Sequence, residues 1–188
     1  VTILTASLSR SGLVSTMSIA QQIPLTNVDN IERENRRYNS SCQELWNVLD
    51  QVKDPEIPVI TIWELGVLQN VTRSGDHVTV TITPTYSGCP AMEVIKEDIL
   101  AALSSAGIND VVVNTQLAPA WTTDWLSSKA KASLKEFGIA TINSDNTIVC
   151  PQCGCNKINQ ISEFGSTSCK ALYQCLECHE AFDLFKSH

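Results

Sequence analysis

The chain has 188 residues, of which 43% are hydrophobic, and its formal net charge is −7. This length and hydrophobic content allow one domain of ordinary size with a small appendage, and no apolar run approaches the roughly 20 residues that span a bilayer. Residues 41–140 hold 12 acidic and 6 basic side chains. We therefore expect neither a membrane protein nor a nucleic-acid-binding face in this segment.

Residues 1–40 show no sustained periodicity and are rich in Ser and Thr, with Arg10 as the only charge before Asp29. This composition predicts a disordered extension. A targeting peptide is an alternative, because such leaders are Ser-rich and poor in acids, but a single Arg and the lack of a strong apolar block argue against it. Met17 lies inside the segment, so a further alternative is that part of it precedes the natural start of translation.

The first predicted element is a helix over Ser41–Val52, because its apolar side chains recur every three or four residues. Ser41 and Glu44 have the spacing of a capping box, and Cys42 lies on the stripe that we expect to be buried. The loop that follows, residues 54–58, carries the carboxylates of Asp54 and Glu56. They could bind a hard metal or position a proton, although a solvated turn in which Asp54 caps the backbone is the commoner arrangement.

Two strands come next. Leu65–Thr72 is predicted to be a strand, and His77–Thr83 alternates between apolar and polar residues; we expect the two to pair as an antiparallel hairpin about the turn Arg73–Asp76. An amphipathic helix is predicted from Ala91 to about Ala106, followed by a β-branched strand over Val111–Leu117. The order helix, strand, strand, helix, strand indicates a small α+β domain.

Cys89 lies in the run Thr-Pro-Thr-Tyr-Ser-Gly-Cys-Pro at residues 83–90, where the second strand gives way to the helix. Pro90 suits the first helical position, so we expect Cys89 to be the N-cap. The positive end of a helix favours an anion, which predicts a thiolate able to bind a metal or attack an electrophile. A small buried structural cysteine is the alternative, and position alone does not separate the two.

Trp121 and Trp125 are expected to be core or interface anchors rather than a ligand cage, and Ser127 or Ser128 is expected to cap a short helix. The polar, unpatterned residues 143–146 are the predicted linker. The predicted organisation is a disordered extension over 1–40, an α+β domain over 41–140 and a cysteine-rich, zinc-ribbon-like module, the ribbon, over 147–188.

Six of the eight cysteines lie between residues 150 and 178. Four form two C-x-x-C pairs with 21 residues between them, namely Cys150 with Cys153 and Cys175 with Cys178. This spacing predicts a tetrahedral metal site, and we expect zinc in a closed, structural role that holds a small module together. Cys155 and Cys169 are additional thiols, so an iron–sulfur cluster is the alternative, with Cys169 as the candidate extra ligand. So many thiols indicate a reducing compartment, the cytoplasm.

Several segments resemble known families. The segment Asp54-Pro-Glu-Ile-Pro58 and the run at residues 83–90 resemble the SufT-like iron–sulfur-assembly domain. This resemblance implies that Cys89 is the reactive cysteine, acting as a transient ligand or transfer thiol, with Asp54 and Glu56 as neighbouring carboxylates. Trp121-Thr-Thr-Asp-Trp125, the two C-x-x-C pairs, Ser162-Glu-Phe-Gly-Ser-Thr167 and Cys169-Lys-Ala-Leu-Tyr173 are similar to the PaaD family, also called PaaJ.

The PaaD resemblance implies an accessory, non-catalytic role in the ring 1,2-phenylacetyl-CoA epoxidase system of aerobic phenylacetate degradation, assisting the maturation of a metal centre or an iron–sulfur cluster. The partners it implies are the di-iron oxygenase and the reductase. Two other functions stay open. The chain could be a thiol enzyme with Cys89 as its nucleophile or redox group, or a pure interaction module in which the ribbon and the two tryptophans bind partner proteins.

Overall fold

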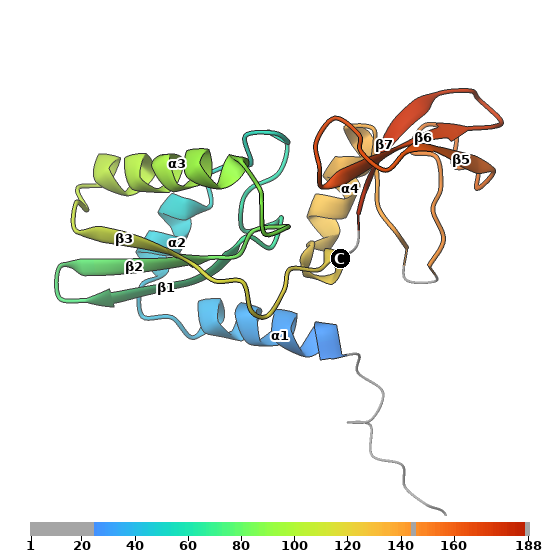
Figure 1. Ribbon diagram of the computed structural model, residues 1–188. Coiled ribbons are helices and arrows are strands. Elements are labelled where there is room, and N and C mark those ends of the chain that lie inside the picture. Colours follow the sequence, from blue (N-terminus) through green and yellow to red (C-terminus); the bar gives the residue numbers. More distant parts are fainter. Residues whose placement is uncertain (1–24, 144–145, 187–188) are drawn as a thin grey trace, which may run out of the picture.

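The computed structural model describes residues 25–143 and 146–186 and arranges them around two β-sheets (Figure 1). The first sheet has three strands in the order β1-β2-β3, and the second has four in the order β4-β7-β6-β5. This element order confirms the prediction of an α+β domain followed by a small β module. None of the helices in the described part of the chain is long and apolar enough to cross a bilayer.

The three-stranded sheet consists of β1 (Leu68–Ser74), β2 (His77–Ile82) and β3 (Val111–Thr115). β1 and β2 form the predicted antiparallel hairpin, with Ser74 opposite His77. The turn therefore contains two residues rather than the predicted four, and Gly75 adopts a φ of 63° there, as such short turns require. β3 runs parallel to β2, so the chain must cross over between them.

The crossover is α3 (Ala91–Ser105), which lies along one side of the sheet in Figure 1. Its predicted apolar stripe is buried in the main core: Met92, Ile95, Ile99 and Leu103. Gly107 follows the helix with a φ of 83°, which confirms the predicted stop. The N-cap is Pro90. Cys89 thus lies one residue before the N-cap, and its predicted N-cap position is wrong.

The prediction that residues 1–40 are disordered is wrong for α1 (Leu25–Tyr38), which is helical, while residues 1–24 lie outside the described residues. α1 is held by Arg33, whose side chain is only 2% exposed. Its guanidinium donates hydrogen bonds to the backbone carbonyl oxygens of Trp63 at 3.1 Å, Leu68 at 3.2 Å and Trp125 at 3.2 Å. Apolar periodicity does not reveal this helix because its buried anchor is a charged residue.

α2 (Gln43–Leu49) is shorter than the predicted helix over Ser41–Val52. The capping box is absent, because the N-cap is Cys42 and it makes no side-chain cap hydrogen bond. The chain instead enters α2 from α1 through a tight connection, in which the side chain of Gln43 donates to the carbonyl oxygen of Arg37 at 2.6 Å. Cys42 is 5% exposed, which confirms its predicted place in the core.

The second sheet contains β4 (Ile139–Ala140), β5 (Ile158–Ser162), β6 (Lys170–Cys175) and β7 (Ala181–Phe185). β5, β6 and β7 are antiparallel neighbours, and β4 joins the edge of the sheet parallel to β7. Since β4 precedes the predicted linker at 143–146, the sheet of the module begins before the predicted boundary at 147.

α4 (Ser128–Glu136) leads into β4 and is capped as predicted, because the Ser127 hydroxyl oxygen accepts a hydrogen bond from the N–H of Ala130 at 3.0 Å. The junction between the two sheets is packed. Trp121 lies 5.3 Å from the Phe185 ring, centroid to centroid, and its indole N–H donates to the carbonyl oxygen of Leu65 at 2.9 Å.

Three residues of the C-terminal unit are buried in the main core, namely Ile139, Cys169 and Phe185. The tryptophans predicted to be anchors are confirmed as such, with Trp121 2% and Trp125 1% exposed. A smaller core cluster fills the C-terminal sheet itself. The module is therefore fixed against the α+β domain through shared apolar contacts.

Candidate functional site

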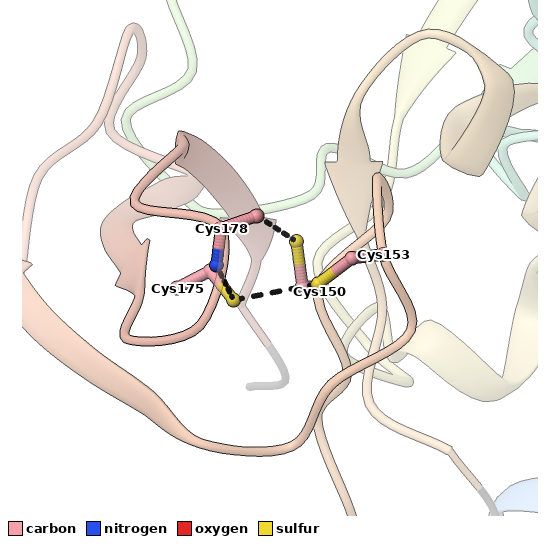
Figure 2. A group of neighbouring side chains, drawn as sticks. All are labelled: Cys150, Cys153, Cys175 and Cys178. Atoms are coloured by element: carbon pink, nitrogen blue, oxygen red, sulfur yellow. Dashed lines mark hydrogen bonds between the residues drawn. The ribbon is translucent and has the colours of Figure 1, made fainter.

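The two C-x-x-C pairs come together at one end of the C-terminal sheet (Figure 2). All four Sγ atoms lie within 4.8 Å of one another. The Sγ atoms of Cys150 and Cys178 are 3.7 Å apart, and those of Cys153 and Cys175 are 3.5 Å apart. We call these four residues the quartet.

Each pair spans a tight backbone turn that directs both thiols inward. In the first turn, the N–H of Gly154 donates to the carbonyl oxygen of Cys150 at 2.9 Å, and Gly154 has a φ of 74°. In the second, the N–H of His179 donates to the carbonyl oxygen of Cys175 at 3.0 Å, and His179 has a φ of 63°. The two turns therefore have the same design, each with a residue in the left-handed region after its second cysteine.

The quartet fits a single tetrahedral metal ion. A Zn–S bond of about 2.3 Å places neighbouring sulfurs about 3.8 Å apart, close to the two Sγ separations observed. Backbone N–H groups of Cys178 and Glu177 donate to the Cys175 sulfur at 3.5 and 3.4 Å. These hydrogen bonds, together with those from the thiols of Cys153 and Cys178, lower the pKa of Cys175 to about 6, whereas burial and the neighbouring thiols raise the pKa values of Cys153 and Cys178. Of these three residues, the surroundings therefore favour a thiolate, the form that binds metals, at Cys175 alone.

Cys89 is half-buried at the start of α3, packed against the main core. The N–H of Ala91 donates to its sulfur, yet burial raises the pKa of Cys89, and the carboxylates of Glu56 and Asp54 raise it further. The predicted thiolate is therefore wrong for the isolated chain at neutral pH. The helix end supplies one N–H group to this sulfur, and that contribution is outweighed by desolvation and by two nearby negative charges.

Asp54 and Glu56 lie beside Cys89 but differ in role. Asp54 is 6% exposed, and its Oδ1 accepts hydrogen bonds from the N–H groups of Glu56 at 2.9 Å and Ile57 at 2.8 Å. The predicted capping by Asp54 is thus confirmed, but its predicted solvent exposure is wrong. Burial raises the pKa of this carboxyl group. Glu56 is half-buried and lines a groove of about 520 Å³ together with residues of the C-terminal sheet, among them Ile139, Lys170 and Asp183.

Cys169 lies apart from the quartet, in the main core, where it is 4% exposed. Its sulfur is 3.0 Å from the hydroxyl oxygen of Thr167. Burial raises the pKa of Cys169, and the charges of Glu56 and Cys89 act on it in the same direction. The thiol that sequence spacing grouped with the cysteine-rich cluster thus belongs to the main core, against which Cys89 also packs. Its position outside both C-x-x-C pairs was the only sequence signal for this arrangement.

Comparison with known proteins identifies two families. Residues 135–186 match the family described as PaaD zinc beta ribbon domain, and residues 42–114 match the family described as iron-sulfur cluster assembly protein.

Individual relatives agree with these matches. A protein of Escherichia coli (strain K12), provisionally named as one of the subunits of 1,2-phenylacetyl-CoA epoxidase, is 46% identical over 150 residues, covering 76% of this chain and 91% of that protein. The Fe-S protein maturation auxiliary factor of Porphyromonas gingivalis is 34% identical over 102 residues, covering 53% of this chain and 96% of that protein. Among solved structures, a domain of unknown function from Bacillus anthracis has 29% sequence identity to this chain. The match covers 55% of this chain and 95% of that domain, with a TM-score of 0.47.

Proposed function

This chain belongs to the PaaD family, and from that membership we propose that it is an accessory, non-catalytic subunit of a ring 1,2-phenylacetyl-CoA epoxidase system. Its task is to assist the maturation of a metal centre or an iron–sulfur cluster in a partner protein. Support comes from the iron–sulfur cluster assembly family that matches residues 42–114 and from the relative named as an Fe-S protein maturation factor. The partners are the di-iron oxygenase and the reductase. All eight cysteines are free thiols, which supports a cytosolic location.

The quartet holds a structural Zn²⁺ in this proposal. An iron–sulfur cluster contains at least two iron and two sulfide atoms, and these would push the cysteine sulfurs apart. The Sγ atoms of the quartet lie within 4.8 Å of one another, which suits a single ion. A site closed by four sulfurs leaves no position for a substrate, so the ion cross-links the two turns. The ribbon it stabilises exposes Ile161 (51%) and Phe164 (63%) near the edge strand β5, and we assign this face to partner docking.

The observation that carries the proposal is the surroundings of Cys89. Its half-buried thiol is acted on by the carboxylates of Glu56 and Asp54. Negative neighbours oppose a free thiolate but attract a cation. A nucleophilic cysteine requires the opposite arrangement, with a basic or cationic partner that stabilises the thiolate. The charges therefore favour a metal-handling thiol over the alternative of a thiol enzyme.

Each residue then has a defined part in handling iron as cargo. Asp54 fixes the loop through its two backbone hydrogen bonds, so Glu56 is held beside Cys89. The carboxylates draw the cation to the loop, and the Cys89 thiol releases its proton to solvent as the iron–sulfur bond forms. Because Cys89 is half-buried rather than enclosed, a partner protein can reach the bound ion and take it.

The test replaces Cys89 by Ser in cells that produce the oxygenase, followed by measurement of iron per oxygenase and of epoxidase turnover. We expect both to fall while the amount of the accessory chain stays constant. The matched control is Cys42→Ser, because Cys42 is another thiol in the same main core that lies on the entry to α2. If the Cys89 variant leaves both iron content and turnover unchanged, the proposal is wrong.

A further inference from the structure

We propose that a groove beside α4 binds an acidic amphipathic helix of a partner protein. The groove has a volume of about 590 Å³, and it is lined by α4, by β4 with the residues that follow it, and by residues 149 and 151 at the start of the ribbon. We call it the lysine groove, because Lys131 and Lys135 of α4 line it. It shares no lining residue with the exposed face at β5 or with the loop at 54–58 and Cys89, so it is a separate binding site.

The two lysines give this groove a positive charge that nothing around them balances. In the part of the chain that the structure describes, no ion pair or hydrogen bond joins either ammonium group to another residue, whereas Lys129 on the same helix lies 2.7 Å from the carboxylate of Glu64. None of the described lining residues is acidic. Residues 127–143 hold three Lys and one Glu, a net charge of +2 in a chain whose net charge is −7. An acidic partner is therefore repelled by most of the chain and attracted to this groove.

Most of the other lining residues are small or apolar. Ala132 and Ala140 allow a backbone to approach closely, and the apolar side chains are those of Ile142, Val149 and Pro151. All three of these are half-buried, so each still exposes surface that a ligand can cover. Positive charge on one wall and apolar surface on the others fit a ligand with one acidic and one apolar face.

The spacing of the lysines indicates a helical ligand. Lys131 and Lys135 lie one turn apart on α4, where the Cβ atoms of residues i and i+4 are about 6 Å apart. A second helix packed beside α4 presents carboxylates at i and i+4 with the same separation, and its apolar stripe then faces the groove. A phosphate ligand fits less well, because phosphate sites rely on arginine or on the N–H groups of a helix N-terminus. The described lining residues include no arginine, and the first turn of α4, residues 128–130, does not line the groove.

The experiment measures, by fluorescence anisotropy, the binding of a labelled amphipathic helical peptide to the full chain loaded with zinc at the quartet. The acidic probe carries Glu at i and i+4 along one face and Leu along the other, and a matched basic probe has Lys in place of each Glu. We expect the parent chain to bind the acidic probe at least about tenfold more tightly than the basic one. This preference should shrink when the salt concentration rises from about 0.1 M to about 1 M.

Charge reversal at both lysines is the decisive change. The double variant Lys131→Glu with Lys135→Glu should bind the basic probe at least about tenfold more tightly than the acidic one. Each single variant should weaken binding of the acidic probe about fivefold. The matched control is Lys53→Glu, which makes the same change of charge at an exposed lysine outside the groove and should keep the affinity of the parent chain. Val149 belongs to neither core cluster, and Val149→Ser should weaken the acidic probe about threefold at low and high salt alike.

A double variant without the reversed preference would overturn the inference, and misfolding does not imitate the expected result, because a misfolded chain gains no new ligand. Two other occupants would also overturn it. These are a single-stranded oligonucleotide that binds the parent chain as tightly as the acidic probe, and inorganic phosphate that displaces the acidic probe at constant ionic strength. Iron does not enter this measurement, so its outcome is independent of whether Cys89 delivers iron to the oxygenase.

Discussion

Replacing Arg33 by Ala should destabilise the α+β domain by about 3 kcal/mol, although the residue carries a charge and lies in a segment without an apolar stripe. The side chain is 2% exposed and makes two buried and one part-buried hydrogen bond to carbonyl oxygens. Hydrogen bonds to a charged group contribute about 1.5 to 3 kcal/mol each, so two fully buried ones give roughly 3 to 6 kcal/mol. The guanidinium also lies 3.9 Å from the centroid of the Trp63 ring, a contact that contributes about 1 kcal/mol.

Burial opposes this gain. It lowers the pKa of Arg33 to about 10, which corresponds to about 3 kcal/mol against the charged form. The remainder is roughly 1 to 4 kcal/mol. The assay is equilibrium urea unfolding followed by tryptophan fluorescence, because all four tryptophans lie between residues 46 and 125 and report on the α+β domain.

The matched control is Arg36→Ala, which removes an exposed arginine from the same helix. We expect that variant to change the free energy of unfolding by less than about 0.5 kcal/mol. If the Arg33 and Arg36 variants unfold at the same urea concentration, the proposed anchoring of α1 is refuted.

Three further outcomes are expected. Cys175→Ala or removal of the metal by a chelator should abolish hydrogen-exchange protection in β5, β6 and β7 while β1 and β2 keep theirs, and equal loss in both sheets would contradict a local structural ion. The rate of Cys89 alkylation by iodoacetamide should rise with pH, with the midpoint of that rise above 9.0, because burial and carboxylates raise the pKa of Cys89. Glu56→Gln should move this midpoint to lower pH. A midpoint below 9.0 in the parent chain would disprove the electrostatic account. Gly66→Ala should strongly destabilise the folded chain, because the added Cβ would lie 2.7 Å from the Cβ of the buried Trp125. Gly75 also has a positive φ, but no atom lies within 4 Å of an added Cβ there, so Gly75→Ala should lower the free energy of unfolding by about 1 kcal/mol. Similar urea midpoints for the two glycine variants would contradict this difference in packing.

The features that could be predicted from the sequence depend on neighbouring residues. The stripe of α3 follows from its spacing of three and four residues, and the quartet follows from two C-x-x-C pairs because each pair is a single tight turn. The order of the elements along the α+β domain could be predicted for the same reason. Each of its elements carries its own periodic signal, and the connections between them are short.

The features that were missed depend on contacts between distant segments. α1 is held by Arg33 through carbonyl groups of residues 63, 68 and 125, none of which is visible in the composition of the helix. The thiolate predicted for Cys89 took account of the helix end but not of burial or of the carboxylates in the loop at 54–58. Cys169 was grouped with the nearest cysteines in sequence, whereas it is buried in the main core. Local patterns therefore located the thiols, and tertiary packing determined their protonation and partners.

The central claim is that Cys89 hands a metal to a partner protein, and a transfer assay tests it most directly. The purified chain, with zinc at the quartet and one further equivalent of Fe²⁺, is mixed with metal-free oxygenase, and the iron bound to the oxygenase is measured after the proteins are separated. We predict that the parent chain and Cys42→Ser deliver iron faster than free Fe²⁺ does, and that Cys89→Ser does not. Equal delivery by the Cys89 variant and the parent chain would contradict the claim.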